Sequence, residues 1–246
     1  MPQDRLSRHF LTLKRRVDDL QQAISEDEIP NIILYSGNDV QVTDKVTLSV
    51  EEGTTPSIYN LGGYDGGFGS NTIYKYTPDS DSATTQSATL GEDIENGTAV
   101  TVNEKVYHLG GDTPNGATDT IYEYDPSADS ITTQSATLPA ATESGTTAAV
   151  DGKVYHLGGI DSSLTDAIYE YDPSADSITT QSATLPQSTF DAASAVVDGN
   201  IYQLGGFAGG AETDTIYEYD PGADSITTQS ATLPGAVREA AGASVS

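Results

Sequence analysis

The sequence repeats itself four times at an interval of 47 or 48 residues, and this repetition constrains the fold more than any other feature. The phrase TTQSATL begins at Thr84, Thr132, Thr179 and Thr227. Glycine pairs recur at the same interval, at Gly62/Gly63, Gly110/Gly111, Gly158/Gly159 and Gly205/Gly206. A unit of about 48 residues is therefore present in four copies.

Each copy has the local signals of four short antiparallel strands. In the second copy, residues 106–111, 121–125 and 130–134 are rich in β-branched and aromatic residues, which favour strands. Residues 125–129 (DPSAD) form a turn signal, and a strand of small residues, such as 192–197, precedes each hairpin. Four copies of a four-stranded unit predict an all-β protein with one sheet in each blade of a propeller.

The repeated pattern resembles the kelch repeat family of β-propellers. The resemblance rests on VDGKVYHLGG (150–159) followed by IYEYDPSADSITTQSATLP (168–186), and its repetition covers residues 57–246. Kelch units usually carry a tryptophan in the fourth strand, where this chain has Ala83, Ile131, Ile178 and Ile226. The resemblance implies a kelch-like β-propeller, whose commonest role is to bind a protein partner.

Four copies are few for this family, so closure of the ring needs an explanation. The tail at residues 238–246 aligns 48 residues after 190–198, and it supplies a first strand with no further strands behind it. The first copy has the opposite defect, because residues 54–56 (TTP) lie where its first strand should end. We predict a four-bladed propeller over residues 54–246 that is closed by the C-terminal strand; the alternative is that the tail pairs with another chain.

The segment before the repeats follows a different period. Apolar residues recur at alternating intervals of four and three, which predicts a coiled-coil-type α-helix within residues 1–28. The residues of this seam are Leu6, Phe10, Leu13, Val17, Leu20 and Ile24. We expect the helix to anchor or oligomerise the protein, with dimer and trimer both open, or else to pack on its own domain. Residues 29–53 predict a small β collar or linker.

Acidic side chains outnumber basic ones by 37 to 10, which gives a formal charge of −27. Nucleic acid and anionic membrane surfaces would be repelled by this field, so we expect no nucleic-acid partner. The longest apolar runs are only a few residues, so we also expect no membrane insertion. Residues 1–28 hold five basic against six acidic side chains, whereas residues 29–246 hold five against 31. Such an acidic excess is typical of surfaces adapted to high salt, where self-repulsion is screened, and it predicts a halophilic source.

The sequence offers little for catalysis. Cysteine is absent, which excludes disulfides and thiol chemistry. Of the three histidines, His108 and His156 occupy a repeat position that is Asn60 and Gln203 elsewhere, so the position favours a polar hydrogen-bonding side chain. The repeated aspartates form turns, with weak calcium binding as the alternative: Asp125/Asp129, Asp172/Asp176 and Asp220/Asp224. We predict no enzymatic activity, no cofactor and no metal site.

One face of the predicted propeller differs between the copies. The turns of the opposite face are nearly uniform, while the loops between the second and third strands and between successive copies vary. Aromatic residues beside Asp, Asn and Gly in such loops suit stacking on sugars or contacts with a protein, although they could also cap the blades. The candidate ligand-binding residues are Tyr64, Asp65, Phe68, Asp112, Asn115, Asp161, Asp166, Phe190, Phe207, Glu212 and Arg238.

These features favour a non-enzymatic binding protein with an N-terminal anchor and a recognition domain. The layout resembles a tailed-virus spike or fibre protein of a halophilic host. It implies a homo-oligomer on the virion surface, held to other virion proteins by the helix, whose propeller recognises a host surface glycan or glycoprotein. The alternative is an intracellular kelch-type interaction scaffold in the cytoplasm of a halophilic archaeon.

Overall fold

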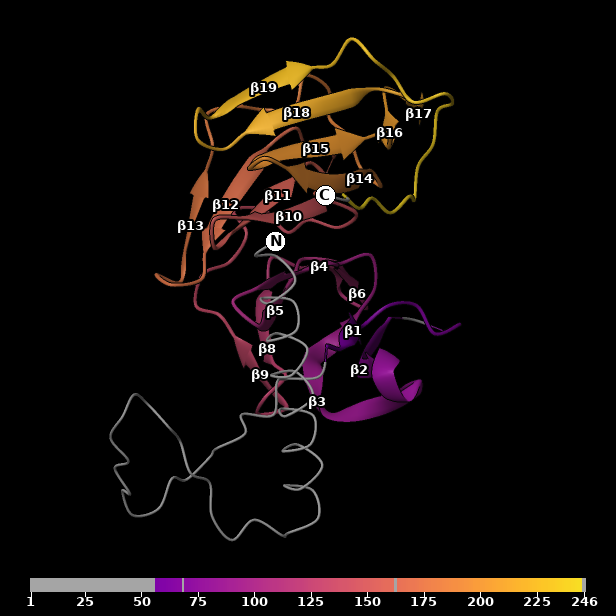
Figure 1. The fold of residues 1–246 in the computed structure, drawn as a ribbon, viewed down its shortest axis with the longest axis vertical. Coiled ribbons are helices and arrows are strands. Elements are labelled where there is room, and N and C mark those ends of the chain that lie inside the picture. Colours follow the sequence, from indigo (N-terminus) through magenta and orange to yellow (C-terminus); the bar gives the residue numbers. More distant parts are fainter. Residues whose placement is uncertain (1–55, 68, 162, 245–246) are drawn as a thin grey trace, which may run out of the picture. The chain divides into compact units, whose positions relative to one another are not determined.

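The computed structural model describes residues 56–67, 69–161 and 163–244. The predicted helix at 1–28 and the predicted collar at 29–53 lie outside these residues. The described residues form four antiparallel sheets of three or four strands, which follow one another in chain order (Figure 1), and two two-stranded hairpins. No described helix is long and apolar enough to cross a bilayer. The prediction of an all-β fold is confirmed for this part of the chain.

The first sheet has three strands, and each of the others has four. The first sheet contains β1 (Ile58–Leu61), β2 (Ser70–Thr77) and β3 (Ser82–Ile94), with the short 3-10 helix η1 (Pro78–Ser80) between β2 and β3. The second contains β4 (Thr98–Val102), β5 (Lys105–Leu109), β8 (Ile121–Asp125) and β9 (Ser130–Thr133). The third contains β10 (Thr146–Val150), β11 (Lys153–Leu157), β12 (Ile168–Asp172) and β13 (Ser177–Thr180). The fourth contains β14 (Ala193–Val197), β15 (Asn200–Leu204), β18 (Ile216–Asp220) and β19 (Ser225–Thr228).

The strands end where the repeated glycines and aspartates require it. After β11, Gly158 and Gly159 both have positive φ, 63° and 105°, which glycine adopts without strain. A Cβ on Gly158 would lie 2.2 Å from the carbonyl oxygen of Thr189, so the chain also needs glycine for the close approach of the next repeat. In the turn between β12 and β13, Asp172 accepts hydrogen bonds from the N–H and hydroxyl of Ser174, at 2.9 and 2.6 Å. The predicted role of this aspartate as a turn former is confirmed.

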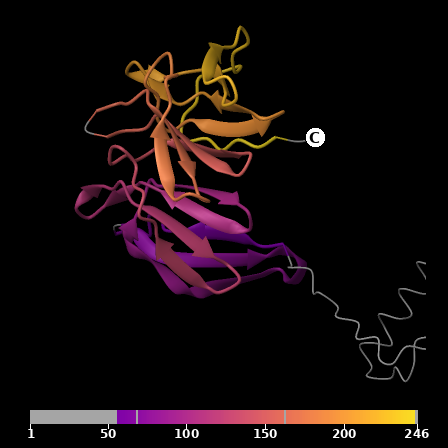
Figure 2. The ribbon, with the colours of Figure 1, turned by 90° about the vertical axis from the view of Figure 1, so that its left-hand side faces the viewer.

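The hydrophobic core lies between successive sheets. Leu157 and Ile168 of the third sheet pack in one cluster with Ile201 and Tyr219 of the fourth. The clusters between the earlier sheets are built in the same way, from the same repeat positions. Figure 2 shows the sheets following one another from the first to the fourth. Each sheet therefore completes the core of its neighbour, which is the packing expected of propeller blades.

Hydrogen bonds that repeat with the sequence also join neighbouring sheets. The last aspartate of each turn between the third and fourth strands accepts the N–H of a serine in, or just after, the last strand of the preceding sheet: Asp129 from Ser87 (2.8 Å), Asp176 from Ser135 (2.9 Å) and Asp224 from Ser182 (2.8 Å). A tyrosine of the third strand donates its hydroxyl to the same carboxylate: Tyr124 (3.1 Å), Tyr171 (3.3 Å) and Tyr219 (3.2 Å). We call this arrangement the sheet-to-sheet contact.

The predicted closed ring is wrong for this structure, and the predicted coiled-coil helix is not among the elements that the structure describes. The sheets are not closed, the first sheet keeps three strands, and the described residues contain no α-helix. The C-terminal residues 238–244 form no strand and pair with no strand of the first sheet. They lie instead beside the fourth sheet, where the N–H of Glu239 donates to the carbonyl of Asp191 (2.8 Å). The tail therefore continues the repeat but does not complete the first sheet.

Candidate binding site

Two of the variable loops form small hairpins of their own. One consists of β6 (Asp112–Thr113) and β7 (Gly116–Ala117), and the other of β16 (Phe207–Ala208) and β17 (Ala211–Glu212). Because the four strands of a sheet are antiparallel, these hairpins lie on the same face as the connections between sheets. We call it the loop face. The loops that vary between the copies lie on this face, which was predicted from the sequence to be the binding face.

An aromatic pair with an arginine lies on the loop face of the fourth sheet. The rings of Phe190 and Phe207 pack at a centroid distance of 5.2 Å and an angle of 46°. The guanidinium carbon of Arg238 lies 5.2 Å from the centroid of Phe207, a cation–π contact, and its Nε lies 3.5 Å from Oε1 of Glu212. Both rings are partly buried. The structure thus brings together four of the eleven predicted residues, which come from three separate segments of the chain.

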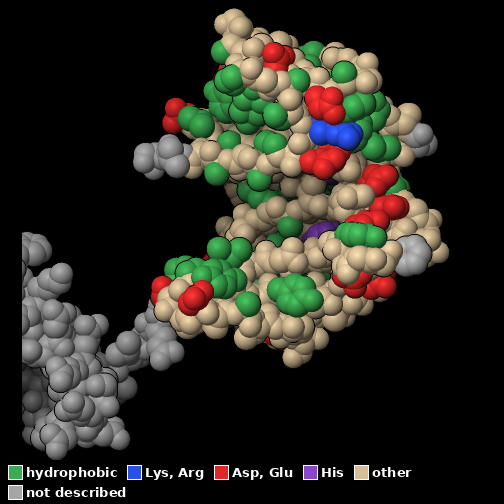
Figure 3. Space-filling view, turned by 90° about the vertical axis from the view of Figure 1, so that its right-hand side faces the viewer, with side chains coloured by type: hydrophobic (Ala, Val, Ile, Leu, Met, Phe, Trp, Pro, Cys, Tyr) green, Lys and Arg blue, Asp and Glu red, His purple; other side chains and the backbone are tan. Residues whose placement is uncertain are grey.

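Carboxylates lie beside Arg238, where Glu212 and Glu239 are both paired with it, and others follow along the loop face. Burial raises the pKa of Glu143, and the nearby carboxylates of Asp112, Asp191 and Glu95 raise it further, while a hydrogen bond from Asn96 lowers it. Burial likewise raises the pKa of Asp191. Figure 3 shows acidic side chains gathered around a basic patch on the described surface. Within the described residues, no three His, Cys, Asp or Glu side chains are placed to hold a metal ion. Arg238 is therefore a cation among carboxylates in the described part of this face.

The remaining predicted residues are spread over the loop face. Tyr64 is exposed, and Asp65 beside it accepts the N–H of Gly67 at 3.2 Å. Asp112 exchanges backbone hydrogen bonds with Glu95, and Asn115 lies in the turn of its hairpin. Asp161 accepts the N–H of Ser163 at 2.8 Å, and the carbonyl of Asp166 accepts the N–H of Leu185. Phe68 lies outside the described residues. No described contact joins Tyr64 to the aromatic pair, so the predicted residues form at least two separate groups.

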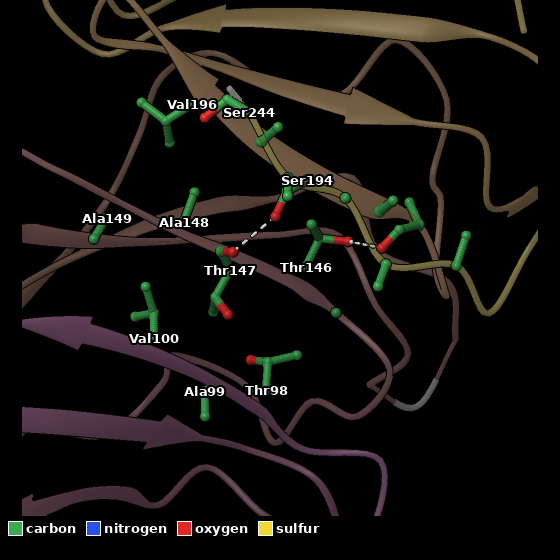
Figure 4. A pocket seen from close by; sticks show the side chains of 18 residues that line it. Thr98, Ala99, Val100, Thr146, Thr147, Ala148, Ala149, Ser194, Val196 and Ser244 are labelled. Atoms are coloured by element: carbon green, nitrogen blue, oxygen red, sulfur yellow. Dashed lines mark hydrogen bonds between the residues drawn. The ribbon is translucent and has the colours of Figure 1, made fainter. Parts of the chain in front are cut away.

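A groove of about 560 Å³ runs along the innermost strands. It is lined by β4, β10 and β14 and by the C-terminal residues 240–244 (Figure 4). Its side chains are alanine, glycine, serine, threonine and valine, without a charged or aromatic group. Hydrogen bonds from Ser194 to the carbonyl of Thr147 (2.9 Å) and from Thr146 to the carbonyl of Ala192 (3.0 Å) join its walls. Figure 3 shows the described part hollowed on one side between its first and last sheets.

The groove was not predicted from the sequence, although a strand of small residues was expected before each hairpin. That strand is innermost in the second, third and fourth sheets, and its alternating small residues leave the space open. A second hollow, of about 390 Å³, lies on the loop face and is lined by Ala117, Ala140, Ala141 and Asp161. Three of these four residues are alanines, which give no signal of binding in a sequence.

The histidines of the repeat are buried beside the innermost strands. Burial lowers the pKa of both His108 and His156 to about 4, so both are neutral at pH 7. Neither ring nitrogen of His156 has a hydrogen-bond partner, and both amide atoms of Gln203 are also unpaired. The sequence predicted a hydrogen-bonding side chain at this position, and at His156 and Gln203 the structure shows a polar side chain without that bond.

The comparisons with known proteins agree with the repeat pattern. The kelch motif matches residues 188–225, which lie in the fourth copy. A solved structure, titled "Structure of YjhT", is similar over 72% of this chain and 67% of that chain, with 17% identity and a TM-score of 0.62. No curated protein sequence matches the chain significantly. The chain thus contains a kelch motif in a kelch-type β-propeller fold, and kelch repeats suggest a protein-interaction domain.

Proposed function

We propose that this chain is a non-enzymatic binding protein that recognises a protein partner through the loop face of its propeller. The observation that carries the proposal is the cluster of Phe190, Phe207 and Arg238. Aromatic and arginine side chains dominate the energetics of protein interfaces, and here they come from loops that differ between otherwise uniform repeats. The kelch motif supports the same class of function, because kelch repeats typically mediate binding.

The biological setting that we propose is attachment of a halophilic virion to its host. The support is the sequence layout, with an acidic repeat region behind a segment of balanced charge, so this part of the proposal rests on resemblance alone. In this setting the partner is a host surface glycoprotein, and residues 1–28 anchor the chain to the particle as an oligomer. An intracellular scaffold would use the same loop face on a cytoplasmic protein.

Binding of the labelled full-length chain to intact halophilic cells in molar salt tests the proposal. The variant Phe207→Ala/Arg238→Ala removes the ring and the cation that lies over it. We expect this variant to bind at least tenfold more weakly, because an anchor residue in an interface contributes about 1.4 kcal/mol or more. The control, Ser174→Ala, changes an exposed residue in a turn of the opposite face and should bind as the unchanged chain does.

The outcomes separate the alternatives. Equal binding by the loop-face variant and the control would contradict the loop-face proposal. Loss of binding after the cells are treated with a glycosidase, but not with a protease, would identify a glycan instead of a protein as the ligand. Binding to no cell surface, with capture of a defined protein from halophilic lysate that depends on Phe207, would favour the intracellular scaffold.

A further inference from the structure

Each pair of successive sheets meets at a junction formed by one surface of the earlier sheet and a different surface of the later sheet. The first sheet has no sheet before it and the last sheet has none after it, so each leaves one of these two surfaces without a described partner sheet. At those junctions a tyrosine of the second strand in one sheet packs against a tyrosine of the third strand in the next. The ring centroids are 5.3 Å apart for Tyr59–Tyr124, 5.8 Å for Tyr107–Tyr171 and 5.9 Å for Tyr155–Tyr219. Together with the hydrogen bonds of the sheet-to-sheet contact, these pairs define a junction that the chain forms three times.

The first sheet exposes the surface that, in each later sheet, packs against the sheet before it. Tyr76 occupies the position of Tyr124 in the repeat, yet it is 38% exposed whereas Tyr124 is fully buried. Ile58, which corresponds to the buried Ile201, is 62% exposed. Asp81 has the left-handed conformation of Asp129 and accepts the hydroxyl of Tyr76 at 3.0 Å. No described backbone N–H meets Asp81 in the way that Ser87 meets Asp129.

The last sheet exposes the complementary half. Val197 is 46% exposed, whereas Val102 and Val150 at the same repeat position are buried. Tyr202 corresponds to Tyr59, Tyr107 and Tyr155, and no described tyrosine ring packs on it as one packs on each of those. Ser230 corresponds to Ser87, Ser135 and Ser182, and no described carboxylate accepts its N–H. The fourth sheet therefore exposes the same surface that each of the first three sheets presents to the sheet after it.

We propose that the first sheet of a second copy of this chain docks on the last sheet of the first copy and repeats the internal junction between chains. Tyr76 of one copy would pack against Tyr202 of the other, and Asp81 would accept the N–H of Ser230. The two surfaces differ, so the contact is head to tail, and two such contacts can close two copies into a ring. Two copies of four sheets make eight, which lies within the usual range of closed propellers.

The structure also provides a place for the second copy along the inner edge. The C-terminal residues 240–244 lie along β14, as β14 lies along β10 and β10 along β4. The first sheet begins with β1, which corresponds to the second strand of the other sheets, and no described strand pairs with its inner edge. If the first sheet of a second copy docks after the fourth sheet, residues 240–244 of the first copy would lie beside β1 of the second copy, in the position of the missing first strand.

Cysteine trapping tests the contact directly, because the natural chain has no cysteine. The full-length variant Asp81→Cys/Ser230→Cys places one thiol on each proposed surface. Mild oxidation in molar salt should produce a disulfide-linked species of twice the 25.7 kDa chain mass on a non-reducing gel. The matched control, Ser87→Cys/Asp129→Cys, places the same pair across an internal junction, where it should form a disulfide within one chain.

The outcomes of the trapping are distinct. A linked dimer, with the internal control also linked, supports the proposal. A disulfide within one chain in the Asp81/Ser230 variant would show that the two ends of one copy meet, and would overturn it. No disulfide in that variant, with the control linked, would also overturn it.

Light scattering of two further full-length variants checks the contact without a disulfide. Tyr76→Asp damages only the first sheet's surface and Val197→Asp only the last sheet's surface. Each variant alone should show half the mass of the unchanged protein, and an equimolar mixture should recover a 1:1 complex because one intact pair of surfaces remains. Association that persists in both variants separately would assign the oligomer to another surface and overturn the proposal.

Discussion

Asp176, in the turn between β12 and β13, accepts a hydrogen bond from the backbone N–H of Ser135, which follows β9 of the second sheet, at 2.9 Å. Burial acts to raise the pKa of this carboxyl, but the hydrogen bonds from the N–H groups of Ala136 and Ser135 lower it overall. The hydroxyl of Tyr171 completes the arrangement, because its single proton is shared between Oδ1 of Asp176 (3.3 Å) and Oε1 of Gln134 (3.1 Å). A residue that looks like a turn former in the sequence therefore holds two sheets together.

Removing the tyrosine hydroxyl should weaken this junction. Tyr171→Phe removes the shared hydroxyl donor of a ring that is almost fully buried and leaves two acceptors without it, so we expect the free energy of unfolding to fall by about 1 to 2 kcal/mol. A urea titration followed by circular dichroism measures the change. The control is Tyr74→Phe, whose half-exposed ring lies on the first sheet at the repeat position of Tyr122. Equal stability of Tyr171→Phe and the unchanged chain would show that the hydroxyl does not stabilise the junction.

Repetition made much of the fold predictable. The strand order within the second, third and fourth sheets follows from β-branched and aromatic residues that recur between glycines and aspartates, and the strands predicted at 121–125 and 130–134 match β8 and β9 closely. Closure of the ring could not be predicted in the same way. Alignment shows that residues 238–246 resemble a first strand, but whether β1 lies close enough to pair with them depends on the rotation from sheet to sheet, which no local pattern encodes.

The candidate site was predictable in part. The sequence places Phe190 and Phe207 on the same face but does not predict that their rings touch, because the two residues lie in different connections of the fourth sheet. The inner groove was missed because alanines and serines carry no functional signal. Both aspartates of each turn were interpreted only as turn formers, because a turn motif explains Asp172 and Asp176 equally well. Only the structure shows that the second of them reaches across to Ser135.

The buried histidines should make the fold sensitive to mild acid. Burial lowers the pKa of His108 and His156 to about 4 in the folded chain, against about 6.5 in the unfolded chain. The unfolded state therefore binds more protons between these values. The stability that depends on neutral histidine is complete above pH 6.5 and is lost as the pH falls towards 4, by up to about 3 kcal/mol for each ring.

The fourth repeat supplies the control for this effect. Gln203 fills the same position without a titratable group, so His156→Gln should lose less stability than the unchanged chain between pH 7 and pH 4.5, by about 2 kcal/mol. Chemical denaturation at the two pH values measures both proteins, and the carboxylates contribute equally to each. Parallel loss in the two proteins would mean that His156 is not the source of the acid sensitivity.

A glycine faces each buried histidine, and the pair should respond to mutation as a unit. A Cβ on Gly145 would lie 2.3 Å from Cε1 of His156, which is too close without a shift of the ring. Gly145→Ala should therefore cost about 1 to 3 kcal/mol by overpacking. In the fourth repeat the corresponding residues are Ala192 and Gln203, so Gly145→Ala/His156→Gln should recover most of that loss in thermal unfolding. Additive losses in the double variant would contradict the steric explanation.

The acidic surface should make the stability of the protein depend on salt at low concentrations. With a formal charge of −27, the acidic side chains repel one another more strongly in the folded chain, where they lie closer together, than in the unfolded chain. Salt screens this repulsion, because the Debye length falls from about 30 Å at 0.01 M to about 10 Å at 0.1 M and about 3 Å at 1 M. We expect Tm to rise steeply with sodium chloride up to about 0.5 M and then to level off, by about 2 to 4 °C for each kcal/mol of repulsion removed. Scanning calorimetry with sodium chloride and sodium sulfate at matched ionic strength measures this dependence, and screening predicts similar curves for both salts. A rise that continues in proportion to concentration and is much larger in sulfate would instead indicate exclusion of the salt from the surface, and would contradict the role of charge repulsion.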